Sequence, residues 1–253
     1  MFAELIISVV IAAFLLEFFD ASIGMGYGEI TALLLLLGFA PLEAIPAVLI
    51  TGAVLNLVAA GLHHEFKNVN FSIKSKDFKI SLVLTIFGGI GIVIGILLAI
   101  KLPEIFLKIY IGVLVMVIGI IILLRDHKKL KFSWKKIIAL GSVAAFNKGM
   151  TGGGYGPVLT GGQIISGVEG KKAVSITTLT EALICIIGFI VYVLIGNSHT
   201  LNWSLIISLL IGGLLATPLA TYAVKKIPTK KLVFVVGIIS IILGIAVLIE
   251  LFL

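Results

Sequence analysis

The sequence predicts an all-α, polytopic integral membrane protein with two inverted-topology repeats of about five helical segments each, broken into short helices at glycine clusters. Three observations predict this fold class. Hydrophobic residues make up 60% of the chain and charged residues 12%, with a mean hydropathy of +1.27, too apolar for a single soluble core. Apolar runs recur with lengths near the roughly 20 residues that cross about 30 Å of hydrocarbon. Two glycine-rich segments, about half a chain apart, align without a gap.

The apolar runs define the expected helices. Long runs lie near residues 2–19, 44–62, 80–100, 104–124, 172–196, 204–224 and 232–253, and shorter ones near residues 28–38, 136–147 and 156–167. Each half is therefore expected to contain two short helices around a glycine cluster, followed by three full spans. The short pair either dips to mid-membrane and returns or crosses twice, and both alternatives leave the later topology unchanged.

The distribution of basic residues predicts domain boundaries and sidedness. We expect a first membrane repeat over residues 1–124, a basic linker over residues 125–136 and a second repeat over residues 137–253. Because cytoplasmic loops are enriched in Lys and Arg, the basic loops 64–79, 125–136 and 225–231 are expected in the cytoplasm. The loop over residues 197–202 carries no Lys or Arg and is expected outside, with both chain termini. The expected location is the plasma membrane.

A comparison of the halves predicts their inversion. Residues 88–124 resemble residues 213–249, with Lys101, Pro103, Gly112 and Gly119 matching Lys226, Pro228, Gly237 and Gly244. The turn at Lys101 should lie outside and the turn at Lys226 inside. Corresponding turns on opposite faces indicate an inverted repeat.

The glycine clusters are the candidate substrate site. Residues 18–28 (FFDASIGMGYG) align with residues 146–156 (FNKGMTGGGYG), which places Asp20 opposite Lys148. Interrupted hydrophobic segments at matching places in two halves point to a transporter's binding site. A helix that starts just after Gly156, with Pro157 in its first turn, would aim its free N–H groups at the cluster and favour an anion. Close helix packing through small residues is the alternative explanation.

These motifs resemble one known family. The sequence GGGYGPVL at residues 152–159, its echo GMGYG in the first half and the order of helices over nearly the whole chain are similar to the sulfite exporter TauE/SafE family. The resemblance implies a permease for sulfite, sulfoacetate and other sulfur-containing anions. One departure is Glu29, which stands where a proline is expected after the first cluster.

Charged residues inside predicted membrane segments are expensive and usually functional. Lys148 is the basic residue well inside an embedded segment, so it is a candidate to hold an anion or to form a salt bridge with Asp20. Glu181 and Asp20 are candidate proton sites for coupling. A structural role as a hydrogen-bonded interior carboxyl is the alternative for Glu181, and a partnered, packed acid is the expected role of Glu17.

The predicted function is a secondary transporter that moves a small sulfur-containing oxyanion by alternating access, with a pocket between the two clusters. The expected substrate-binding residues are Lys148, Asn147, Thr151, Gly152, Gly153, Gly154, Tyr155, Gly156, Gly24, Gly26, Tyr27, Gly28 and Asn56. The polar side chains among them could donate hydrogen bonds to an oxyanion or hold helices together. No cofactor is implied. The expected partners are the anion and the lipid bilayer, without nucleic acid, and a homodimer is a candidate assembly.

Two rival functions remain from the sequence. An inorganic cation or metal permease would use Asp20, Glu29 and Glu181 as ligands. A membrane-embedded enzyme would need a nucleophile, a base and an orienting group, and the sequence carries no such combination. The adjacent His63 and His64 are expected at the membrane interface rather than in a metal site, and Cys185 is expected to be a packing residue.

Overall fold

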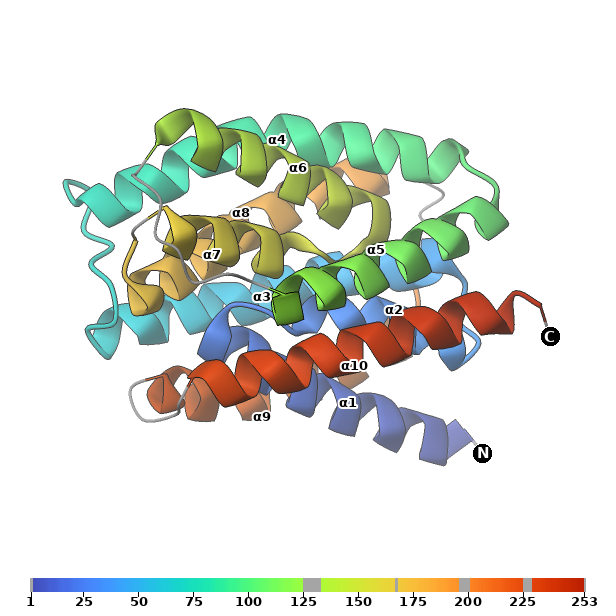
Figure 1. The fold of residues 1–253 in the computed structure, drawn as a ribbon. Coiled ribbons are helices and arrows are strands. Elements are labelled where there is room, and N and C mark those ends of the chain that lie inside the picture. Colours follow the sequence, from blue (N-terminus) through green and yellow to red (C-terminus); the bar gives the residue numbers. More distant parts are fainter. Residues whose placement is uncertain (1, 125–132, 167, 196–200, 225–228, 253) are drawn as a thin grey trace.

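The computed structural model describes residues 2–124, 133–166, 168–195, 201–224 and 229–252, which form helices and connecting turns without a β-strand (Figure 1). The helices are α1 (Phe2–Ile23), the short 3-10 helix η1 (Tyr27–Glu29), α2 (Ile30–Leu36), α3 (Pro41–Glu65), α4 (Lys76–Lys101), α5 (Glu104–Leu124), α6 (Trp134–Thr151), α7 (Tyr155–Ile165), α8 (Gly170–Ile195), α9 (Trp203–Ala223) and α10 (Thr229–Glu250). Six of the helices described (α1, α3, α4, α5, α8 and α9) are long and apolar enough to cross a membrane. The prediction of an all-α, polytopic membrane protein is confirmed.

Local sequence signals explain where several helices begin. The Ser75 side chain caps α4 by accepting a hydrogen bond from the Phe78 amide at 3.1 Å. The Asn202 side chain caps α9 in the same way, with the Leu205 amide at 3.0 Å. Pro41 occupies the first turn of α3, where its missing N–H costs nothing. These caps set the ends of the long spans that surround the glycine clusters.

The chain reverses direction at both glycine clusters. Positive φ angles occur at Gly24 (74°) and Gly26 (146°) in the first cluster and at Gly152 (73°) and Gly154 (77°) in the second, a backbone region that favours glycine. Helix α7 therefore begins at Tyr155, two residues before the position expected from the sequence, because Gly154 already completes the turn. Each short helix then packs against the helix that precedes it.

The helix pairings of one half are repeated in the other. Helix α1 packs along α9 as α6 packs along α4, and α3 contacts α9 as α8 contacts α4. The remaining large contacts join equivalent helices, α3 with α8 and α5 with α10. This pattern is what two repeats related by a pseudo-twofold axis produce.

Glycine contacts between α5 and α10 show the same symmetry between the two halves. A Cβ atom at Gly112 would meet the carbonyl oxygen of Gly244, and a Cβ atom at Gly119 would meet that of Gly237. In the alignment of the halves, Gly112 matches Gly237 and Gly119 matches Gly244. Replacing each glycine by its match therefore turns one contact into the other. Small residues allow such close approach of helices in membranes. The repeat boundaries stay a prediction, because residues 125–132 lie outside the described part of the chain.

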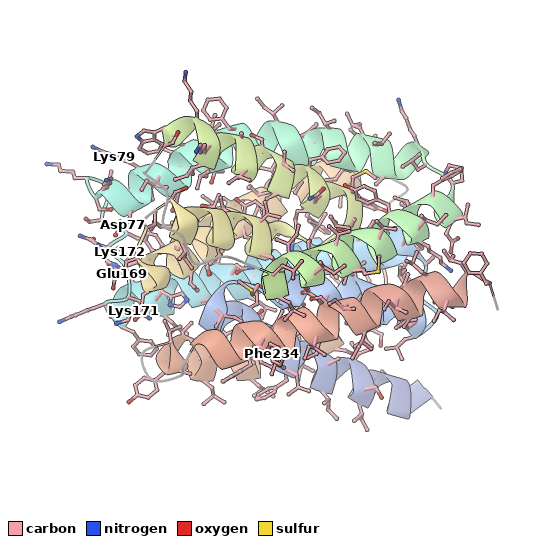
Figure 2. The ribbon with its side chains drawn as sticks, viewed as in Figure 1. Asp77, Lys79, Glu169, Lys171, Lys172 and Phe234 are labelled. Carbon is pink, nitrogen blue, oxygen red and sulfur yellow. The ribbon has the colours of Figure 1, made fainter. Side chains whose placement is uncertain are left out.

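Basic side chains gather at one end of the bundle. Lys79, Lys171 and Lys172 lie at the same end in Figure 2, opposite the end that holds both chain termini in Figure 1. Helix α3 finishes at the basic end, where α8 begins, so these equivalent helices run in opposite directions. Of the four loops used to predict sidedness, only 64–79 is fully described, because residues 125–132, 196–200 and 225–228 lie outside the described ranges.

Candidate functional site

A buried ion pair lies at the centre of the bundle. Lys148, in the last turn of α6, places its Nζ atom 2.6 Å from Oε1 of Glu181 on α8. Lys148 is completely buried and Glu181 is 3% exposed. A charge pair removed from water is retained only with good geometry, and losing one partner leaves an uncompensated charge. Two residues that the sequence singled out are thus brought together.

Lys148 does not form the salt bridge with Asp20 that was one of the two alternatives for it, because its partner is Glu181. The Asp20 carboxylate instead accepts a hydrogen bond from the Tyr27 amide at 3.3 Å, so it braces the turn into η1. Asp20 still interacts electrostatically with both Lys148 and Glu181. The physical reason is that α8 packs against α3 and contacts α6, which brings Glu181 within reach of the Lys148 ammonium.

Gly52 of α3 lies next to the ion pair. A Cβ atom on Gly52 would lie 3.5 Å from Cys185 Sγ, 3.9 Å from Asn56 Nδ2 and 4.0 Å from Lys148 Nζ. These are ordinary contact distances, so a methyl group would fit. The amide nitrogen of Asn56 is buried and has no hydrogen-bond partner among the described residues. The space over Gly52 therefore combines an ammonium with an unused donor.

The two cluster tyrosines differ in their bonding. Both are buried, and the Tyr27 hydroxyl donates to Thr51 Oγ1 at 2.9 Å. The Tyr155 hydroxyl has no partner within the described part of the structure, although it interacts electrostatically with Glu181 and Cys185. A buried unsatisfied hydroxyl costs about 1–3 kcal/mol, so such a group needs an explanation. A ligand oxygen near Lys148 would supply one.

The glycine clusters lie in direct backbone contact. A Cβ atom on Gly153 would collide with the Gly28 carbonyl oxygen, and one on Gly156 with the Gly24 carbonyl oxygen. The Thr160 hydroxyl adds a hydrogen bond across the halves, 3.1 Å from the same Gly24 oxygen. The clusters must therefore separate before a ligand can reach the amide groups between them.

Other predicted site residues hold the second cluster in shape. Asn147 Oδ1 accepts a hydrogen bond from the Tyr110 hydroxyl at 2.7 Å. The Thr151 hydroxyl lies 2.9 Å from the Asn147 carbonyl oxygen and accepts from the Gly153 amide at 3.0 Å. In the first cluster, Gly26 packs against the backbone of α1. Asn147 and Thr151 thus have partners already, unlike the amide nitrogen of Asn56.

The remaining buried acids lie apart from one another. Glu29 Oε1 accepts from the Ser240 hydroxyl at 2.8 Å, and Glu17 Oε1 lies 3.0 Å from the Thr217 hydroxyl. No group of three His, Cys, Asp or Glu side chains is placed to hold a metal ion within the described ranges. His63 is buried and its Nδ1 bonds Asn68 at 3.0 Å, whereas His64 is exposed. The cation alternative gains no support from this arrangement.

A family model for the sulfite exporter TauE/SafE matches residues 9–247. The chain belongs to this family. A curated relative from Bacillus subtilis (strain 168), the probable membrane transporter protein YtnM, is 28% identical over 232 residues, which cover 87% of this chain and 75% of the relative. No solved structure matches. The protein is a membrane transporter of the TauE/SafE family.

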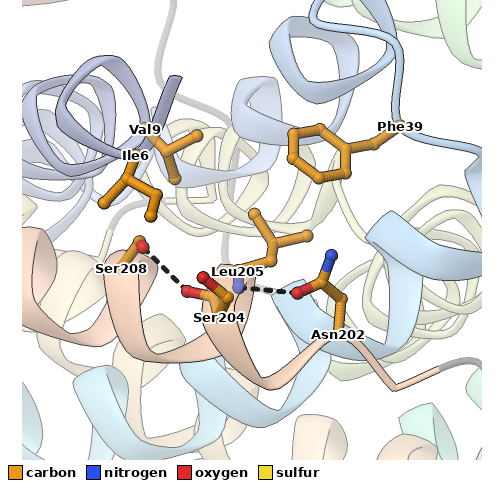
Figure 3. A pocket seen from close by; sticks show the side chains of 7 residues that line it. All are labelled: Ile6, Val9, Phe39, Asn202, Ser204, Leu205 and Ser208. Carbon is orange, nitrogen blue, oxygen red and sulfur yellow. Dashed lines mark hydrogen bonds between the residues drawn. The ribbon is translucent and has the colours of Figure 1, made fainter. Parts of the chain in front are cut away.

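A separate cavity of about 50 Å³ lies between α1, α9 and the turn after α2 in this TauE/SafE transporter. Figure 3 shows that the polar groups of the cavity form hydrogen bonds within the first turns of α9. The Asn202 side chain accepts from the Leu205 amide, and the Ser208 hydroxyl donates to the Ser204 carbonyl oxygen. The lining is otherwise formed by apolar side chains such as Ile6 and Phe39. This cavity is not lined by the Lys148–Glu181 pair.

Sequence reasoning missed three residues around the TauE/SafE centre. Thr51 and Gly52 lie on α3, and Cys185 lies one turn after Glu181 on α8. A usable signal for Gly52 was its spacing from Asn56, because residues four apart share one helix face. Cys185 was predicted only to pack, and no local pattern reveals that Lys148 lies beside it.

Proposed function

We propose that the protein is a secondary transporter that moves a small sulfur-containing oxyanion, sulfite or an organosulfonate such as sulfoacetate, across the plasma membrane by alternating access. The observation that carries this proposal is the buried Lys148 ammonium next to the unused donor of Asn56. A positive charge and neutral donors in a dry interior suit an oxyanion. The sulfur chemistry rests on the family to which the chain belongs.

Glu181 and the transported anion would compete for the same ammonium. In the structure Glu181 forms an ion pair with Lys148, so an incoming oxyanion would have to displace the Glu181 carboxylate. Displacement would break the contact between α6 and α8, beside the place where the two clusters touch. Substrate binding would thereby loosen the closed centre, which is the differential interaction that a population shift requires.

Charge balance favours proton coupling. The Lys148–Glu181 pair is internally neutral, and an anion adds a negative charge that no other fully buried basic side chain of the described residues offsets. A net charge is costly in the membrane interior. Glu181, once released from Lys148, and nearby Asp20 are the candidate proton acceptors. A proton would then cross the membrane with the anion and balance its negative charge.

The sidedness that we propose follows from the basic end of the bundle. The end with Lys79, Lys171 and Lys172 would face the cytoplasm, and both termini would face outward. An epitope tag at either terminus is expected to be accessible on intact cells.

The function is tested by uptake of radiolabelled sulfite into proteoliposomes. We expect protein-dependent uptake that unlabelled sulfite and sulfoacetate reduce and that divalent cations leave unchanged. Empty liposomes measure passive leak. Protein-dependent flux of a divalent cation without anion flux would overturn the proposal.

Cys185 provides a native reporter of this centre. It is the single cysteine of the chain, and its sulfur lies across the space over Gly52 from Lys148. We expect a membrane-permeant maleimide to label it only when the centre opens, and saturating sulfoacetate, a sulfonate that does not react with maleimides, to slow that labelling. Mass spectrometry measures the modified fraction, and Cys185→Ala is the control for background. Labelling at the same rate with and without a transported anion would place the anion elsewhere.

Gly52→Ala is expected to fold normally but to transport large anions poorly. The added methyl meets only ordinary contacts, so stability in detergent should change little, whereas it fills space beside Lys148. Competition by sulfoacetate should therefore weaken more than competition by sulfite. Gly61→Ala, on the same helix with nothing described within 4 Å of its Cβ position, is the matched control. Equal losses for both anions would show that this space does not select by size.

A further inference from the structure

Glu17 forms a buried acid site between α1 and α9 that the anion site does not use. Its side chain is completely buried, and its Oε1 atom lies 3.0 Å from the hydroxyl of Thr217. Its second oxygen, Oε2, has no hydrogen-bond partner in the described structure. An unpaired carboxylate oxygen at such depth is costly, whereas a carboxylic acid is far less so.

Hydrogen-bond counting around Thr217 indicates the protonation state of Glu17. The Thr217 oxygen lies 2.9 Å from the Gly213 carbonyl oxygen and 3.0 Å from Glu17 Oε1. A hydroxyl has one hydrogen, and a carbonyl oxygen can only accept. Both contacts are satisfied together when Thr217 donates to Gly213 and Glu17 carries a proton that it donates to Thr217. An ionised Glu17 would leave one of the two contacts without a hydrogen.

Glu29 also has an Oε2 atom without a hydrogen-bond partner among the described residues, but its hydroxyl partner is arranged differently. Its partner, the Ser240 hydroxyl, lies 2.8 Å from Glu29 Oε1 and makes no second hydrogen bond within the described residues. Its hydrogen is therefore free to serve an ionised Glu29. The two buried glutamates have similar burial but differ in what their hydroxyl partners can donate, which makes Glu29 a matched control.

The charges around Glu17 agree with a bound proton. Asp20 lies three residues further along α1, on the same face, and adds a like charge. The other ionisable groups that interact with Glu17 are Tyr27 of η1, Lys148 of α6 and Glu181 of α8. Because Glu181 already neutralises Lys148, an ionised Glu17 would have no counter-charge of its own. From α3, His63 interacts with the backbone of α1 at Ala21.

We propose that Glu17 is a membrane-embedded proton-binding site and that its proton, rather than one taken up by Glu181 or Asp20, is the coupling ion for anion transport. The second clause rests on the proposed function. In this scheme the first half binds the proton at Glu17, and the second half binds the anion at Lys148. The proton leaves Glu17 when α1 and α9 separate and water reaches the carboxyl. Glu17 is a coupling residue in this scheme and does not touch the anion.

Infrared spectroscopy of the protein in lipid tests the site without any substrate. Wild type at neutral pH is expected to show a carbonyl stretching band of a protonated carboxyl group that Glu17→Gln removes. Thr217→Val removes the acceptor and is expected to shift this band to higher frequency, whereas Glu29→Gln is expected to leave it unchanged. A wild-type spectrum without the band, or a band that persists in Glu17→Gln, would overturn the assignment.

Flux measurements test the coupling. In proteoliposomes, wild type is expected to exchange labelled for unlabelled sulfite and to gain protein-dependent sulfoacetate flux when a pH gradient is imposed. Glu17→Gln should keep the exchange and lose the response to pH, and Glu29→Gln should keep both. Absence of exchange in wild type would count against the proposed function, whereas an unchanged pH response in Glu17→Gln would count against the coupling role alone. A response to a sodium gradient instead of pH would also overturn it.

Discussion

Lys148→Met is expected to abolish anion transport and to destabilise the protein. Methionine keeps the apolar length of the side chain but removes the ammonium, which contributes a charged hydrogen bond of roughly 1.5–3 kcal/mol to an oxyanion. Anion affinity should fall by about tenfold to a hundredfold or more. Glu181, 2.6 Å from the lost ammonium, would remain buried without a counter-charge, at a cost of about 3–5 kcal/mol. Uptake of radiolabelled sulfite and thermal unfolding in detergent measure the two effects.

The double variant Lys148→Met/Glu181→Gln separates stability from transport. Removing both charges leaves no unpaired ion, so the thermal stability of the double variant should recover relative to Lys148→Met. Transport should not recover, because the positive charge is still missing. Transport near the wild-type rate in the double variant would show that the pair is a structural salt bridge that transport does not require.

The fold was predictable because its signals are periodic and local. Apolar runs of spanning length and glycine clusters at matched positions predicted the helices and both chain reversals, and the described structure contains them. The exact start of α7 was not predicted. Glycines at positions 152, 154 and 156 are all compatible with a turn, and only the three-dimensional structure shows that the chain turns at Gly154.

The site was predictable in part. Lys148 and Glu181 were singled out as charges in apolar surroundings, but their pairing depends on how α8 crosses the bundle, which local patterns do not encode. The alignment of repeats favoured Asp20 as the partner, because it assumed that symmetry of backbone extends to side chains. The charges in fact break the symmetry. The role of Thr217 at Glu17 was equally hidden, since the two residues are far apart in the sequence and meet only through the packing of α1 on α9.

Gly156→Ala is expected to cause a large loss of stability for a single added methyl group. Gly156 lies in the first turn of α7, and an added Cβ atom would collide with the Gly24 carbonyl oxygen and approach the backbone of Met25. Backbone atoms cannot rotate away as a side chain can, so the two clusters would have to separate. Overpacking of this kind costs about 1–3 kcal/mol, and backbone contacts favour the upper end. The melting temperature in detergent should fall clearly below that of wild type.

The position of the clash also predicts a functional effect that general destabilisation would not produce. If the contact between the clusters closes the centre, forcing it apart should expose Cys185, which is buried in the intact protein. Maleimide labelling of Gly156→Ala at a temperature well below its melting transition should therefore be faster than that of wild type, and less sensitive to sulfoacetate. Gly61→Ala controls for the added methyl, because nothing described lies within 4 Å of its Cβ position. A Gly156→Ala protein that melts and labels like wild type would mean that the two clusters separate without cost, and that the closed contact does not guard the centre.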